Sequence, residues 1–187
     1  MKIKKLQSFS VEDQKILGTF GYTSFFKYEV KKEETSEKLS IYVEKQALEK
    51  PYIKLYKEDS EDYERYERIL PLGFSLGGFL DNKLIAVAIC EPTYWNNTLK
   101  IWHFQVNENY RRMNIGKALM ACTIDLARSE GFRAVDLETQ NTNAPAVDFY
   151  KQCGFELDGI DVSFYTNNDL NDGEVAFFMK KRTSMDL

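Results

Sequence analysis

The sequence predicts an α+β fold in which helices cover both faces of a mixed, mostly antiparallel central sheet. One observation is a series of apolar runs, at residues 73–80, 84–92 and 99–106, which are separated by the polar stretches DNK and TYWNNT as in antiparallel hairpins. A second observation is that helix-like and strand-like segments alternate after residue 114, before two final strands. This order is typical of a mixed sheet and fits poorly with a doubly wound dinucleotide fold.

The first third of the chain is its most polar part and is expected to hold a hairpin and a short helix. FFKYEVKKEE (25–34) and KLSIYVEKQAL (38–48) have the pattern of two strands around the polar turn TSE. In KEDSEDYERYERIL (57–70), acidic residues precede Tyr63, Tyr66 and Leu70, which indicates a short helix with a negative first turn.

The second half supplies the remaining elements. In residues 115–130, Ile115, Leu119 and Ile124 lie at helical spacing, and Gly131 marks the end of that helix. The segments that follow are predicted to be a strand, a helix and two strands, at 133–139, 143–153, 155–165 and 174–181. No repeat or low-complexity linker interrupts the chain, so we expect a single domain over residues 1–187.

Composition excludes several classes of protein. With 43% hydrophobic and 29% charged residues, the chain has an ordinary globular composition, and no stretch is long and apolar enough for a membrane span or a signal peptide. Cys90, Cys122 and Cys153 are scattered, which indicates reduced thiols and therefore a cytoplasmic protein. The net charge of −4 argues against nucleic acid as the main partner, and a single histidine against a histidine-rich metal site. We predict no metal.

The turn YRRMNIGKAL, residues 110–119, is the first candidate binding site. A helix that begins near Ile115 leaves its first backbone N–H groups unpaired at the positive end of the helix dipole. Arg111 and Arg112 add positive charge, Gly116 leaves room for an approaching group, and Asn114 tolerates a left-handed backbone. These features suit a pyrophosphate, although an ordinary charged turn has the same composition.

Two look-alikes of known nucleotide-binding motifs do not qualify as such. GFSLGGF opens no helix, so it lacks the context of a Rossmann fingerprint. The Gly-Lys pair in IGKAL has no upstream P-loop glycine and no following Ser or Thr, so nucleoside triphosphate chemistry is not expected.

Two motifs in order give the chain a family resemblance. R-x-x-N-x-G at residues 111–116 follows a strand, and N-x-x-A-x-x-F-Y-K-x-x-G-F at 143–155 follows the next one. The pair resembles the GNAT acetyltransferase superfamily, whose first motif is usually Q/R-x-x-G-x-G/A. The chain is more narrowly similar to streptothricin acetyltransferases, which carry similar WNN, LETQ, FYxxxGF and Dxx(L/F)Y stretches after an upstream PYxKxY…EDxxxY. The superfamily resemblance covers about residues 73–182 and leaves 1–72 as a variable N-terminal part.

The resemblance implies a cofactor site. Acetyl-CoA would be the co-substrate, and its pyrophosphate would bind the turn formed by Arg111, Arg112, Met113, Asn114, Ile115, Gly116 and Lys117. Two central strands would splay, so that the pantetheine lies beside Phe104, Gln105 and Val106. Asn143 would contact the cofactor, and Tyr150 would be the general acid that protonates the departing CoA thiolate.

The chain departs from the family pattern at two places. Asn114 replaces the usual first glycine of the turn. Trp102 and His103 replace two carboxylates that the streptothricin enzymes carry in IEDIAV, which puts the acceptor in question more than the fold. Strand alternation places 102 and 104 on one face and 103 and 105 on the other, unless a bulge changes the parity.

The resulting functional hypothesis is direct transfer of an acetyl group from acetyl-CoA to the primary amine of a small cationic, streptothricin-like acceptor. An amine attacks only when neutral, so a base must take its proton, and His103, Glu138 and water are all candidates. Acceptor contacts are expected from Trp95, Trp102, Glu138 and Tyr165. The alternatives are an N-acetyltransferase of proteins or peptides and a non-catalytic acyl-CoA-binding regulatory domain. A homodimer is left open.

Overall fold

A computed structural model describes residues 1–57 and 59–183 and divides the chain into two compact units. Unit 1 consists of Met1–Phe20, Leu55–Leu137 and the residues from Lys180, and unit 2 consists of Gly21–Lys54 and Glu138–Met179. Strands β7 (Ala134–Gln140) and β9 (Ala176–Arg182) each contribute residues to both units.

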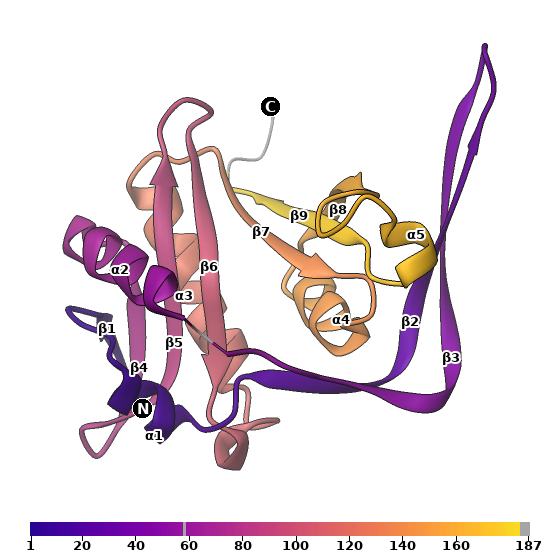
Figure 1. The fold of residues 1–187 in the computed structure, drawn as a ribbon. Helices are drawn as coiled ribbons and strands as arrows, with labels where there is room; N and C mark the ends of the chain where they lie inside the picture. The colour runs from indigo at the N-terminus through magenta and orange to yellow at the C-terminus, as the bar shows by residue number, and fades with distance from the viewer. Residues whose placement is uncertain (58, 184–187) are drawn as a thin grey trace. The chain divides into compact units, whose positions relative to one another are not determined.

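Unit 1 is built on a mixed sheet. Its strands are neighbours in the order β1 (Lys2–Lys5), β4 (Leu76–Leu80), β5 (Lys83–Thr93), β6 (Thr98–Val106) and the first part of β7 (Figure 1). All pairs are antiparallel except β6 with β7, which is parallel. The predicted α+β class with a mostly antiparallel sheet is confirmed.

Helices cover both faces of this sheet. The helices of unit 1 are α1 (Val11–Leu17), α2 (Ser60–Ile69) and α3 (Ile115–Ser129), with the short 3₁₀ turns η1 (Leu70–Leu72) and η2 (Glu108–Tyr110). Side chains of α1 and α2 share one apolar cluster with Val87 and Ile89 of β5. Helix α3 packs against β4, β5 and β6, and Figure 1 shows it behind the strands that α2 covers in front. Helices on both faces explain why β5 is buried along most of its length.

Local sequence fixes where the first two helices begin. Ser10 and Asp13 form a capping box before α1, and Asp59 and Asp62 form another before α2. Glu61 and Asp62 also place negative charge in the first turn of α2, as the sequence predicts.

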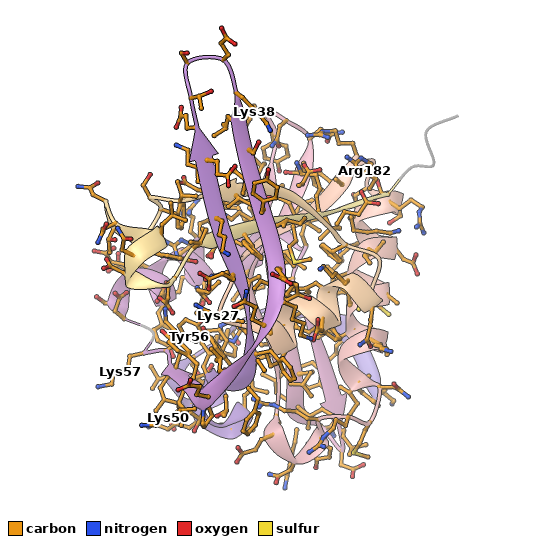
Figure 2. The ribbon with its side chains drawn as sticks, turned by 90° about the vertical axis from the view of Figure 1, so that its right-hand side faces the viewer. Lys27, Lys38, Lys50, Tyr56, Lys57 and Arg182 are labelled. Atoms are coloured by element: carbon orange, nitrogen blue, oxygen red, sulfur yellow. The ribbon has the colours of Figure 1, made fainter. Side chains whose placement is uncertain are left out.

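Unit 2 contains a long hairpin and the last elements of the chain. Strands β2 (Gly21–Glu34) and β3 (Leu39–Leu55) form a two-stranded sheet, and Figure 2 shows Lys38 near its tip. The other elements are α4 (Ala144–Gln152), β8 (Glu156–Asp161), α5 (Asp169–Asp172) and the first part of β9, which lies between β7 and β8 in the strand order.

Asn141 ties three segments of unit 2 together. Its backbone carbonyl and side-chain Nδ2 bind the N–H and carbonyl of Tyr28 in β2, at 2.8 and 2.9 Å. Its backbone N–H and Oδ1 bind the carbonyl and N–H of Val175, at 2.9 and 2.8 Å. This buried side chain thereby holds the end of β7 between the hairpin and the start of β9.

The structure differs from the elements predicted from the sequence at three places. The strand predicted over 155–165 ends at Asp161, because that carboxylate accepts the N–H of Ser163 and turns the chain. Asp169 then accepts the N–H groups of Tyr165 and Thr166 and is the first residue of the unpredicted helix α5. The sequence also assigns no element to residues 1–20, where β1 and α1 lie.

Candidate active site

The turn before α3 presents backbone N–H groups, as the sequence predicts. Arg112 and Asn114 both have positive φ, at 61°, and Asn114 is the N-cap residue of α3 without a capping hydrogen bond from its side chain. The N–H groups of the first helical turn have no acceptor inside the helix. Two left-handed residues before such a turn make a concave, electropositive backbone site of the kind that binds anions.

Side chains around the turn complete this site. Arg111 is anchored, because its Nε donates to the carbonyl of Val106 at the end of β6. Arg112, Met113 and Lys117 are exposed, whereas Ile115 and Gly116 are half-buried at the helix start. The turn therefore carries three cationic side chains, those of Arg111, Arg112 and Lys117, directly after the end of β6. The cofactor hypothesis places the pantetheine beside that strand.

Strand β6 changes its pairing where the resemblance predicts a splay. Its parallel pairing with β7 runs from Thr98 to Ile101, so residues 102–106 continue past the last paired residues. On the other side, Ile89 pairs with His103 and Cys90 with Ile101, so Trp102 is the extra residue of a β-bulge. The pairing of β6 with β7 thus ends at Ile101, and Phe104, Gln105 and Val106 lie in the segment beyond the last pair.

His103 lies in a buried polar network. Its Nδ1 is 3.2 Å from the hydroxyl of Tyr66, and its Nε2 is 3.1 Å from Oε1 of Gln105. Its ring stacks on Phe20 at 4.2 Å, and Gln105 in turn donates to the carbonyls of residues 17–19. Both ring nitrogens therefore have protein partners, which is the arrangement of a structural core histidine.

The two tryptophans occupy different parts of the β5–β6 hairpin. Trp95 lies in the turn and is 87% exposed. Trp102 lies four residues beyond Thr98, about 13 Å further along the strand. Its Nε1 donates to Glu91 at 2.6 Å, and Arg65 and Lys100 lie over its ring at 4.3 and 3.9 Å from the centroid. The Trp102 ring, which the sequence analysis expects to contact the acceptor, therefore already contacts two cationic side chains of the protein itself.

Tyr150 of unit 2 is held in its protonated form. It lies at the end of α4 and packs against Phe149 and Phe155, with ring centroids 5.5 and 5.8 Å away. Burial raises the pKa of its phenol, and the negative charge of Glu138 raises it further. At neutral pH the phenol of Tyr150 therefore keeps its proton. Asn143 caps the same helix by accepting the N–H of Ala146.

Glu138 belongs to a group of polar side chains in unit 2. The hydroxyl of Tyr165 donates to Glu138 Oε1. Glu174 accepts from Tyr52 at 2.8 Å and from Thr142 at 3.5 Å through Oε1, and from Lys54 at 2.5 Å through Oε2. Lys54 also lies 5.6 Å from the centroid of the Tyr165 ring. We call this group the carboxylate cluster; it consists of Tyr22, Tyr52, Lys54, Glu138, Thr142, Tyr165 and Glu174.

The sequence identifies only part of this cluster. It indicates Glu138 and Tyr165, but it misses Tyr22, Tyr52, Lys54, Thr142 and Glu174. The signal for two of these was present, since Tyr52 and Lys54 are the tyrosine and lysine of the PYIKLY stretch. Tyr22 has no such motif, and only the fold brings its hydroxyl to 2.7 Å from Thr142 and its ring against Tyr52.

The part of the chain that the structure describes has neither a metal-binding cluster nor a membrane-spanning helix. Residues 1–57 and 59–183 contain no group of three or more His, Cys, Asp and Glu side chains that could hold a metal ion. Over the same residues, no helix has the length and apolar character needed to cross a bilayer.

Comparison with known proteins identifies a family that the chain matches. The model of the acetyltransferase (GNAT) family matches residues 41–155. A streptothricin acetyltransferase of Streptomyces lavendulae is 34% identical over 99 residues, which are 53% of this chain and 52% of that protein. The chain thus spans about half the length of the curated relatives it matches.

Two solved structures share the fold over nearly the whole chain. A nourseothricin acetyltransferase superposes with a TM-score of 0.74 at 22% identity and covers 98% of both chains. A provisionally named streptothricin acetyltransferase from Bacillus anthracis, solved in complex with acetyl coenzyme A, has a TM-score of 0.70 at 24% identity, over 97% of this chain and 98% of its own. At these identities the likeness shows the fold.

Proposed function

The chain belongs to the acetyltransferase (GNAT) family, and on that premise we propose that it transfers an acetyl group directly from acetyl-CoA to a primary amine. The observation that carries the proposal is the turn before α3, with left-handed Arg112 and Asn114 ahead of an uncapped helix start. Its N–H groups suit the pyrophosphate of acetyl-CoA, and Arg111, Arg112 and Lys117 add positive charge. Residues 104–106, beyond the last pair of β6 with β7, offer their backbone to the pantetheine.

Tyr150 is proposed as the general acid. When the neutral acceptor nitrogen attacks the thioester carbonyl, the new C–N bond forms, the C–S bond breaks and the sulfur leaves as a thiolate. The nitrogen gives up its second proton to water, and that proton replaces the one that Tyr150 donates. A phenol whose pKa is raised by burial and by Glu138 stays protonated at neutral pH and can give its proton to that thiolate. No acyl-enzyme is required, and the thiol of Cys90 is buried, which raises its pKa and makes it a poor nucleophile.

Glu138 is proposed as the contact for the acceptor ammonium and as the first recipient of its proton. Its carboxylate accepts from Tyr165 beside the rest of the carboxylate cluster. His103 is the weaker candidate, because both of its ring nitrogens already have partners in a buried network. Water is the remaining route for the proton.

The acceptor is proposed to be a small, cationic, streptothricin-like amine. Tyrosine rings and carboxylates together suit an alkylammonium group, since rings bind its charge face-on and carboxylates accept its hydrogen bonds. Relatives that carry the name streptothricin acetyltransferase support this choice.

A thiol-release assay with a panel of amines tests the proposal. We expect CoA release with streptothricin, free lysine or simple diamines, and a matching gain of streptothricin resistance in cells that express the protein. Turnover of a peptide N-terminus without turnover of these amines would assign the protein to peptide acetylation. CoA binding without release for any acceptor would make it a non-catalytic acyl-CoA-binding domain.

A further inference from the structure

Lys54 is the cationic member of the carboxylate cluster, and the proposed reaction gives it no role. Its Nζ lies 2.5 Å from Glu174 Oε2 and 5.6 Å from the centroid of Tyr165, whose hydroxyl donates to Glu138. A carboxylate and an aromatic ring are the partners that proteins offer to an alkylammonium ligand. The chain's own ammonium therefore occupies surroundings suited to a second ammonium of an acceptor.

The pair formed by Lys54 and Glu174 is shielded enough to influence a nearby charge. Their side chains are only 27% and 21% exposed, so their field is less screened than that of a pair on the open surface. Tyr52 and Thr142 donate to the other oxygen of Glu174, which fixes the carboxylate beside Lys54. The pair is neutral as a whole, and Glu138 contributes the remaining negative charge of the cluster.

We propose that Lys54 is a specificity-determining residue that sets the charge the acceptor site accepts. By neutralising Glu174, it leaves the cluster with one net negative charge, which suits one acceptor ammonium at Glu138. A second ammonium close to the first meets Lys54 and is repelled. This inference rests on the proposed function, because it assigns the carboxylate cluster to the acceptor.

The same charge balance favours release of the product. Acetylation converts the acceptor ammonium into a neutral amide, with the proton lost to the base. Glu138, which receives that proton first and passes it to water, then has no ammonium group to attract. A cluster with two net negative charges would hold dicationic acceptors and their partly acetylated products more tightly.

The test compares two acceptors of equal chain length, 1,5-diaminopentane and 1-aminopentane. Lys54→Met removes the charge and keeps most of the length of the side chain, whereas Lys54→Arg keeps the charge. We expect Lys54→Met to raise the ratio of kcat/KM for the diamine over the monoamine about tenfold, through a lower KM. Lys54→Arg should leave the ratio within about twofold of wild type.

Glu174→Gln is a second test, and it should change the diamine-to-monoamine ratio of kcat/KM in the opposite direction. It also tests the inference if Lys54→Met fails to fold. With Lys54 kept and the carboxylate removed, the diamine-to-monoamine ratio should fall at least threefold. An unchanged ratio in a folded Lys54→Met or Glu174→Gln protein would overturn the inference. Dissociation constants for both amines, measured by NMR titration, report on the same ratio without turnover. A shifted binding ratio with no CoA release would overturn the proposed function alone.

Discussion

The phenol of Tyr150 is kept protonated by two effects that act in the same direction. Removal from water disfavours the phenolate, and the nearby carboxylate of Glu138 repels it. A general acid for a thiolate needs to hold its proton until charge develops on sulfur. The surroundings of this one side chain therefore suit the role better than an exposed tyrosine would.

Replacement of that hydroxyl tests the role directly. We expect Tyr150→Phe to fold and to bind CoA with unchanged affinity, while kcat falls by about 10²-fold or more because the thiolate loses its proton donor. Steady-state thiol release and calorimetry with CoA measure the two quantities. Tyr94→Phe, at a residue 72% exposed, is the matched control and should behave as wild type. An unaltered kcat in Tyr150→Phe, with product release shown to be fast, would leave Tyr150 as a packing residue.

At the scale of elements, the hairpin of unit 2 is joined to α4 through Asp148. Tyr28 of β2 donates to Asp148 Oδ1 at 2.8 Å, and Lys45 of β3 pairs with Oδ2 at 2.5 Å. Burial alone would raise the pKa of Asp148, but the hydrogen bonds from Lys45 and Tyr28, together with the positive charges of Lys45 and Lys151, outweigh it and lower the pKa. The ionised carboxylate therefore stabilises the contact between the hairpin and the helix that carries Tyr150.

This contact should show as a pH-dependent stability. A carboxyl group with a lowered pKa contributes its stability above the unfolded value and loses it as the pH falls through the folded one. Asp148→Asn should therefore cost about 0.5–1.5 kcal/mol at neutral pH, a range kept small because the pair is 37% exposed. The difference in unfolding free energy between the variant and wild type should shrink as the pH falls below 3.8, the ordinary pKa of an aspartate.

Urea unfolding followed between pH 7 and pH 3 measures the effect. Asp125→Asn is the control, because Asp125 is 69% exposed and pairs with Arg128 on the same helix. A constant difference between wild type and Asp148→Asn at all pH values would show that the charge of Asp148 is not what joins the two elements.

Elements with a strong local pattern could be predicted from the sequence. The hairpin strands, α2, α3 and α4 have turn residues, caps or apolar periodicity that decide their structure locally. Strand β1 and helix α1 lack a long periodic run, and they are stabilised by packing of Leu6, Phe9 and Leu17 into a cluster with β5. The end of β8 is decided by hydrogen bonds of Asp161 and Asp169, which a run of alternating residues does not reveal.

The residues of the candidate site likewise differ in whether the local sequence predicts them. The turn at residues 111–117 is continuous in sequence, so its composition alone predicted an anion site and the left-handed Asn114. The bulge at Trp102 depends on pairing with β5, and only the pairing shows which residue it displaces. The carboxylate cluster joins β3 residues to Glu174, which lies 120 positions from Lys54 along the chain. Tertiary contacts of that separation leave no local signal.

At the scale of the whole molecule, the proposed cofactor site is a positive region on a negative protein. The chain carries a net charge of −4, yet Arg111, Arg112 and Lys117 gather at one helix start. The overall field therefore opposes a polyanionic ligand, and affinity for CoA has to come from short-range N–H groups and these three cations. Such affinity should weaken as salt screens the cations.

Ligand-linked stability tests this view of the molecule. At 100 times its dissociation constant, CoA should stabilise the folded protein by about 2.7 kcal/mol and raise the unfolding midpoint by about 5–10 °C. Gly116→Glu should abolish the shift, because it fills the anion site with bulk and with like charge. Ala121→Glu, which adds the same charge at an exposed position further along α3, should keep it. Thermal unfolding with and without CoA, repeated at 50 and 500 mM salt, measures the shift, and calorimetry checks the affinity. A Gly116→Glu protein that binds CoA as tightly as wild type would place the pyrophosphate somewhere other than at this turn.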